Sequence, residues 1–128
     1  MTTLRQWQKC TTAGERWQHA KAGLRVCWRH SSFRTATLCC TLFWCLAFCA
    51  GCTWHCLATV ALAFCFAMTV EQLNTALELA VDHTSLKWHP LARDAKDVAG
   101  AASTLAFTCA FVLAILSTWA AWLSRTTG

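Results

Sequence analysis

The residues that could do chemistry gather in one polar segment, residues 71–82, which reads EQLNTALELAVD. Glu71, Asn74 and Glu78 are spaced three and four residues apart, and Asp82 follows one turn later, so a helix would place them in a column on one face. Carboxylates beside an apolar segment are costly unless a cation or a metal pairs with them. Mg²⁺ prefers carboxylate and phosphate oxygens and would relieve the repulsion along this column. The alternative is that the column is merely the solvated face of a helix end.

A second polar group follows within a short stretch of chain. Lys87, Trp88 and His89 precede the only proline, and Lys96 and Asp97 come shortly after it. Phosphoryl transfer requires metal ligands, a cation on the transferred group and a base that orients the attacking hydroxyl, and these residues supply such groups. The sequence has neither a glycine-rich phosphate loop of the G-x-x-x-x-G-K-S/T type nor the protein kinase motifs, so any nucleotide chemistry must use a different kind of site.

Long apolar segments flank these groups. The chain is 56% apolar and only 13% charged, whereas soluble domains are about 45–50% apolar. Residues 35–70 contain His55 as their one ionisable side chain apart from cysteines, over about twice the roughly 18 residues that a spanning helix needs. Gly51 marks a turn that divides this segment into a helical hairpin of residues 35–50 and 53–70. Residues 98–123 form a third apolar segment, so we expect an all-α integral membrane protein with three transmembrane helices.

The basic residues predict the orientation of these spans. Before the first span the only acid is Glu15, whereas the hairpin turn has no lysine or arginine. The positive-inside rule therefore places the N-terminus and residues 71–97 in the cytoplasm. Residues 17–33 mix aromatic, aliphatic and basic side chains at near-helical spacing, which favours an amphipathic helix on the cytoplasmic leaflet over a basic tail that only sets topology. The basic residues before the first span are Arg5, Lys9, Arg16, Lys21, Arg25, Arg29 and Arg34.

The ten cysteines allow two interpretations. The first interpretation is a metal or redox site, because four cysteines recur at helical spacing near His55: Cys45, Cys49, Cys52 and Cys56. The second interpretation is helix packing. These cysteines lie among alanine, leucine and phenylalanine, where cysteine usually acts as a small apolar residue that permits close helix packing. We favour the packing interpretation.

The two polar groups together resemble a known signature. EQLNTALELAVDH, residues 71–83, and WHPLARDAKDVAGAAS, residues 88–103, resemble the small, membrane-integral bacterial diacylglycerol kinases, whose pattern is an E-x-x-N-[ST]-A-[IL]-E helix followed by A-K-D. GLRVCWRHSSFR, residues 23–34, extends the resemblance. It implies one domain over residues 1–128: a surface helix in 1–34, the hairpin in 35–70, an active-site segment in 71–97 and the third span in 98–123. It also implies a homotrimer in the bacterial inner membrane, with each site shared between neighbouring subunits.

The resemblance implies a role for each candidate residue. Glu71 would be the general base on the lipid hydroxyl, Glu78 a ligand of Mg²⁺, and Asn74 a polar neighbour that orders the nucleotide site. The other residues that would contact or flank the nucleotide are Lys87, Trp88, His89, Lys96 and Asp97. Beside Glu71, the residues that would contact the lipid are Trp28, Phe33 and Arg34.

The implied activity is transfer of the γ-phosphate of ATP to diacylglycerol, with Mg²⁺, to give phosphatidic acid, and no nucleic-acid partner is expected. Relatives with the same signature phosphorylate undecaprenol, which is an alternative acceptor. A third alternative is a catalytically weakened or silent relative. The family pattern has a glutamate shortly before its Ala-Phe-Arg segment and an acid two residues after that arginine. Here the first is missing between His30 and Ser31, and Ala36 replaces the second.

Overall fold

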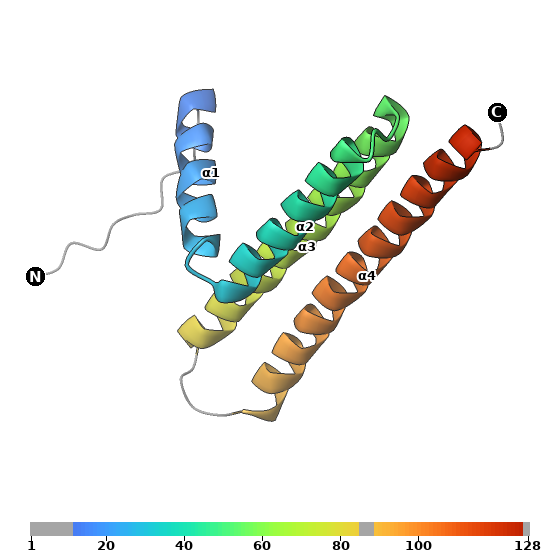
Figure 1. The fold of residues 1–128 in the computed structure, drawn as a ribbon. Helices are drawn as coiled ribbons and strands as arrows, with labels where there is room; N and C mark the ends of the chain where they lie inside the picture. Colours follow the sequence, from blue (N-terminus) through green and yellow to red (C-terminus); the bar gives the residue numbers. More distant parts are fainter. Residues whose placement is uncertain (1–11, 85–88, 127–128) are drawn as a thin grey trace, which may run out of the picture.

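The computed structural model describes residues 12–84 and 89–126, and these residues form four helices with short turns after the first two. This part contains no strand, which confirms the predicted all-α class. α2 and α3 lie side by side as a hairpin, and α4 runs back along α3 in the opposite direction (Figure 1). The helices are α1, Ala13–Cys27; α2, Ser31–Cys49; α3, Trp54–Thr84; and α4, Pro90–Thr126.

Three of these helices, α2, α3 and α4, are long and apolar enough to cross a membrane. This confirms the prediction of three helices with the length and apolarity of membrane spans, and it fits a multi-pass membrane protein. Two of the helices extend beyond the predicted apolar segments. α3 continues without a break through the polar segment to Thr84, and α4 begins at Pro90 rather than near Val98. Proline suits the first position of a helix because its missing N–H group would have no partner there.

The corner between α1 and α2 differs from the helix expected over residues 17–33. α1 ends at Cys27, because the amides of Arg29 and His30 donate to Val26 O and Cys27 O, both at 3.0 Å, and tighten the last turn. Phe33 therefore belongs to α2, where it is buried. Its ring meets that of Trp28 edge to face at 6.2 Å across the corner.

The hairpin turn lies where Gly51 predicted it. Gly51 has a φ of 71°, in the left-handed region that favours glycine. Its amide donates to Phe48 O at 2.8 Å and the Cys52 amide donates to Ala47 O at 3.1 Å, which is a Schellman motif at the end of α2. From the end of α4, Arg125 Nη1 donates to Ala50 O at 2.8 Å. The turn is thus fixed both by its own backbone and by α4.

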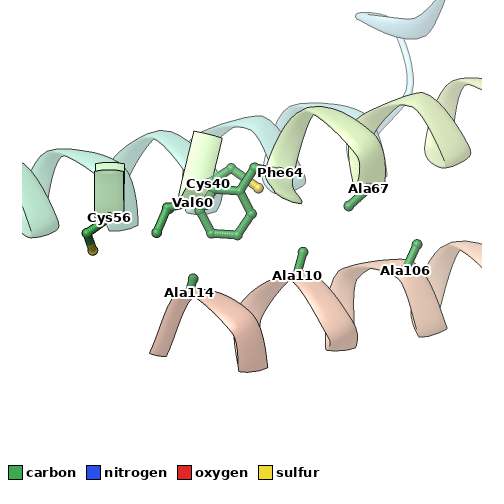
Figure 2. Close-up of a cluster of buried hydrophobic side chains, with 8 residues drawn as sticks. All are labelled: Cys40, Cys56, Val60, Phe64, Ala67, Ala106, Ala110 and Ala114. Atoms are coloured by element: carbon green, nitrogen blue, oxygen red, sulfur yellow. The ribbon is translucent and has the colours of Figure 1, made fainter. Parts of the chain in front are cut away.

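The core lies mainly between α3 and α4. Figure 2 shows Ala114, Ala110 and Ala106 of α4 opposite Val60, Phe64 and Ala67 of α3, in antiparallel order. Small side chains on α4 let the two helices approach closely, as is usual in membrane bundles. Large apolar side chains on the outer faces remain exposed, which suits contact with lipid; among them are Leu38, Leu42, Leu62, Phe66, Leu105 and Val112.

Cysteines contribute to this core and also to its outer surface. Cys40 of α2 and Cys56 of α3 are buried in the core cluster, whereas Cys45 and Cys49 are exposed. All cysteines within residues 12–84 and 89–126 are free thiols. Among these residues no group of three histidine, cysteine or acidic side chains is placed to hold a metal ion. The packing role of Cys49 and Cys52 stays a prediction.

Candidate active site

Glu71 is the buried acid at the polar end of the α3–α4 core. It follows Ala67 by one turn on the face of α3 that packs against α4, and only 5% of the residue is exposed. Ser103 of α4 donates its hydroxyl to Glu71 Oε2 at 2.5 Å. The other oxygen, Oε1, is also buried and accepts no hydrogen bond from any described residue. A carboxylate with one held oxygen and one unpartnered oxygen is suited to accept a proton.

Asn74 and Glu78 continue the column along α3, as their spacing predicted. Asn74 Nδ2 donates to Glu78 Oε1 at 3.3 Å, and both residues are half-buried. Asn74 Oδ1 is buried and has no hydrogen-bond partner in the described part of the chain. The column therefore presents a carboxylate and an unpartnered amide oxygen on neighbouring turns.

Lys96 brings a cation to the same end of the bundle. Its ammonium lies 2.5 Å from Asp82 Oδ1 and links the start of α4 to the end of α3. The side chains are 36% and 54% exposed, so this ion pair is open to solvent and within reach of a soluble ligand. Lys96 thus lies beside Asp82, the last acid of the column, and its role toward a nucleotide stays a prediction.

Other candidates for nucleotide contact are not gathered at the column. Asp97 lies on the exposed side of α4, with its carboxylate 3.4 Å from Arg93 Nε. His89 caps α4, because its Nδ1 accepts the Leu91 amide at 3.2 Å. Lys87 and Trp88 lie outside the described residues. Nucleotide roles for these residues stay predictions.

The end of α1 approaches Glu71 from the other side of α3. Cys27 is buried there; burial raises the pKa of its thiol, and the negative charge of Glu71 raises it further. An open groove of about 480 Å³ runs between α1 and α3, from Leu24 and Cys27 to Gln72 and Thr75. The groove is mostly apolar, and one of its lining residues, Gln72, directly follows the buried acid in the chain.

The three residues expected to contact lipid lie around the neighbouring corner. Trp28 is half exposed at the end of α1, Phe33 is buried, and Arg34 is exposed in the first turn of α2. Phe33 therefore supports the corner through its ring contact with Trp28. The lipid contacts of all three stay predictions.

The sequence interpretation missed Ser103. A weak signal was present: Ser103 precedes Ala106, Ala110 and Ala114 at intervals of three, four and four residues, which is the spacing of one helix face. These are the four buried residues of α4. A polar residue in such a stripe must meet the partner helix, but only the observed register shows that it meets Glu71.

The column could hold a hard divalent cation. Glu78 offers a carboxylate, and the unpartnered Asn74 Oδ1 is the kind of oxygen that such a cation accepts. Two protein oxygens suffice for Mg²⁺ when phosphates and water complete its shell. Because no three-residue ligand group occurs among the described residues, such an ion would depend on the phosphates of a bound nucleotide.

Comparison with known proteins indicates the family of this chain. The family described as prokaryotic diacylglycerol kinase matches residues 18–118. A diacylglycerol kinase of Pseudomonas aeruginosa is 46% identical over 54 residues, which is 42% of this chain and 40% of the relative. A diacylglycerol kinase of Helicobacter pylori is 48% identical over 42 residues, 32% of this chain and 33% of the relative. The aligned segments thus span less than half of either relative, but the family match extends over α1 to α4, and the chain belongs to the prokaryotic diacylglycerol kinase family.

Proposed function

We propose that this protein is a lipid kinase that transfers the γ-phosphate of ATP to the hydroxyl of diacylglycerol and yields phosphatidic acid. The observation that carries the proposal is the buried Glu71 carboxylate, with Oε1 unpartnered among the described residues, where the apolar core meets the polar column. A lipid held by its acyl chains presents its hydroxyl at this depth. The names of the two bacterial relatives support the same reaction.

In the proposed reaction Glu71 is the general base. Its Oε1 takes the proton of the lipid hydroxyl while the hydroxyl oxygen bonds to the γ-phosphorus. The bond from that phosphorus to the bridging oxygen breaks, ADP leaves, and Glu71 later releases the proton to water. Transfer of this kind depends mainly on positioning and on stabilisation of charge, so a small site with few groups is adequate.

The column beyond Glu71 would bind the nucleotide. Glu78 lies two turns farther along α3, about 10 Å at 1.5 Å per residue, and with Asn74 it would hold the Mg²⁺ that accompanies ATP. This ion would neutralise phosphate charge. Lys96, held beside the column by Asp82, would contact the phosphates. The further nucleotide contacts that the family resemblance implies are Lys87, Trp88, His89 and Asp97.

The assembly proposed is a homotrimer in the bacterial inner membrane with a cytoplasmic N-terminus. α1 would lie on the cytoplasmic leaflet, and its exposed Trp17, with Lys21 Nζ 5.2 Å from the ring centroid, is suited to that interface. Trp28, Phe33 and Arg34 would then border the lipid substrate. A neighbouring subunit would add groups to a column in which Glu78 is the one half-buried acid.

A direct assay tests the activity. The purified protein in mixed micelles is given labelled ATP and either diacylglycerol or undecaprenol, with Glu71→Gln as the matched inactive variant. Phosphatidic acid from diacylglycerol alone, dependent on Glu71, supports the proposal. Label in undecaprenol alone would show that undecaprenol, not diacylglycerol, is the phosphate acceptor. Label in neither lipid would indicate a catalytically silent relative.

A further inference from the structure

Glu71 of α3 and Ser103 of α4 are two polar residues buried where these helices pack together, and Thr75, one turn after Glu71, is a further buried polar residue of α3. Glu71 and Ser103 are each 5% exposed, and their 2.5 Å hydrogen bond joins the two helices. Ser103 is the first of the buried small residues along one face of α4. The three that follow, Ala106, Ala110 and Ala114, point toward α3 (Figure 2). An alanine at position 103 would complete the stripe, so close packing alone does not require a serine there.

The hydroxyl of Ser103 behaves differently from most hydroxyls in these helices. Serine and threonine in apolar helices commonly donate to the carbonyl four residues earlier in their own helix. Thr104, the next residue, does this with Gly100 O at 2.9 Å. Six other threonines do the same: Thr37, Thr41, Thr59, Thr69, Thr108 and Thr118. Ser103 instead donates across the interface to a carboxylate.

We propose that Ser103 is a positioning residue for Glu71: its hydroxyl holds Oε2 in place so that Oε1 faces the lipid hydroxyl. The terminal torsion of a glutamate is broad and has no strong preference of its own, so an outside contact must fix the plane of the carboxylate. The inference rests on the proposed function, because it assumes that Glu71 is the base. It adds the residue that decides which carboxylate oxygen accepts the proton.

The hydrogen bond is compatible with both states of the base. An ionised carboxylate can only accept, so the Ser103 hydroxyl donates, and a bond from a hydroxyl to a charged oxygen is short and strong. After Oε1 takes the proton, Oε2 remains an acceptor and the same bond persists. The carboxylate therefore keeps its orientation from the start of the proton transfer to its end.

Kinetic comparison of matched variants tests the role. In Ser103→Ala the carboxylate is free to rotate, and we expect kcat to fall about 10- to 100-fold because misplaced catalytic groups cost that much. The KM values for Mg-ATP and for diacylglycerol should stay within two-fold, since the proposed role of Ser103 involves contact with Glu71 and with neither substrate. Ser103→Thr keeps the hydroxyl and should recover most of kcat. Thr104→Ala removes a neighbouring hydroxyl that bonds only its own helix, and should retain wild-type kcat.

Infrared spectroscopy gives a readout that does not need turnover. The carboxylate bands of Glu71, identified as the difference between wild type and Glu71→Gln, should shift in Ser103→Ala and stay in place in Thr104→Ala. If Ser103→Ala does not fold, Ser103→Cys, whose thiol is a weak donor, carries the same comparison. An unmoved band, or a kcat within two-fold of wild type, overturns the positioning role. If the wild type phosphorylates no lipid, the proposed function fails while the band shift still decides whether Ser103 holds Glu71.

Discussion

Lys96 of α4 and Asp82 of α3 form a 2.5 Å ion pair at the end of the bundle where the acidic column meets solvent. The pair joins the two helices on either side of their connecting loop. Because both side chains are substantially exposed, this ion pair contributes no more than about 1 kcal/mol to the stability of the fold. Its larger consequence is that a lysine ammonium is kept beside the residues proposed to bind nucleotide phosphates.

This arrangement predicts different effects for the two partners. Lys96→Gln should raise the KM for Mg-ATP about ten-fold or more, because a phosphate contact is lost. Asp82→Asn keeps an oxygen that can accept a hydrogen bond from the ammonium, so Lys96 should stay in place and that KM should change by less than three-fold. Steady-state kinetics and thermal inactivation of both variants give the measurement. Equal increases in KM would mean that Lys96 acts through its ion pair rather than on the nucleotide.

Glu71→Gln tests the proposed base with little disturbance of the fold. Glutamine has the same shape and keeps an amide oxygen that can accept the Ser103 hydroxyl, so the α3–α4 interface should stay intact. Loss of a general base should lower kcat about 10²- to 10⁴-fold. The KM for Mg-ATP should change little, because Glu78 and Lys96 are unaltered. Full activity in this variant would remove Glu71 from the chemistry.

The features that could be predicted from sequence follow from local geometry. The Glu71 column is set by the helical period, so the contact between Asn74 and Glu78 required no knowledge of tertiary structure. The hairpin turn could be placed because Gly51 is the residue that tolerates a φ of 71°. The three spans follow from their length and hydropathy alone.

The features that could not be predicted depend on packing between segments far apart in the chain. Ser103 and Glu71 meet because α3 and α4 adopt one particular antiparallel register, which composition does not specify. The α1–α2 corner at residues 28–30 contains neither proline nor glycine, so no residue marked the end of α1 at Cys27. Asp97 turned toward Arg93 because an i,i+4 partner was available on its own helix.

Glu78→Gln should change the Mg²⁺ dependence rather than the chemical step. Removing this carboxylate leaves Asn74 Oδ1 as the remaining protein oxygen of the proposed metal site, so half-maximal activity should require several-fold more Mg²⁺ at constant ATP. At saturating Mg²⁺ most of kcat should return. A titration of activity against Mg²⁺ in wild type and variant gives the comparison. An unchanged midpoint would show that Glu78 is not a metal ligand.

Restoring an acid at the α1–α2 corner provides a complementary test. Insertion of Glu between His30 and Ser31 supplies the glutamate that the family pattern has before the Ala-Phe-Arg segment. If its absence weakens metal binding, the insertion should lower the Mg²⁺ midpoint by several-fold. Insertion of Gln at the same point is the matched control for the added length. Equal midpoints in the two insertions would indicate that this acid has no role here.

Gly51→Ala should destabilise the hairpin turn. An L-residue in the left-handed region costs about 1–2 kcal/mol, and a new Cβ would lie 3.2 Å from Arg125 Nη1, the group that donates to Ala50 O. Gly14→Ala in α1 is the matched control, since a Cβ there meets nothing within 4 Å. Thermal inactivation in detergent should place Gly51→Ala clearly below wild type and Gly14→Ala at or above it. Equal stability of the two variants would contradict the role assigned to this turn.

The proposed orientation can be measured with reporter fusions. Three spans and a cytoplasmic N-terminus require that the chain returns to the cytoplasm after α3 and leaves it again through α4. A reporter joined after residue 89 should therefore be cytoplasmic, and one joined after residue 128 periplasmic. A variant with a changed charge distribution provides the control that the reporters respond to topology. Adding two lysines to the hairpin turn while replacing Arg16, Lys21 and Arg25 by Gln should weaken or invert this pattern, because lysine and arginine near the spans set orientation. A cytoplasmic reading at both fusion points would mean that α4 does not cross the membrane, and would contradict the three-span arrangement on which the cytoplasmic placement of Glu78 and Lys96 depends.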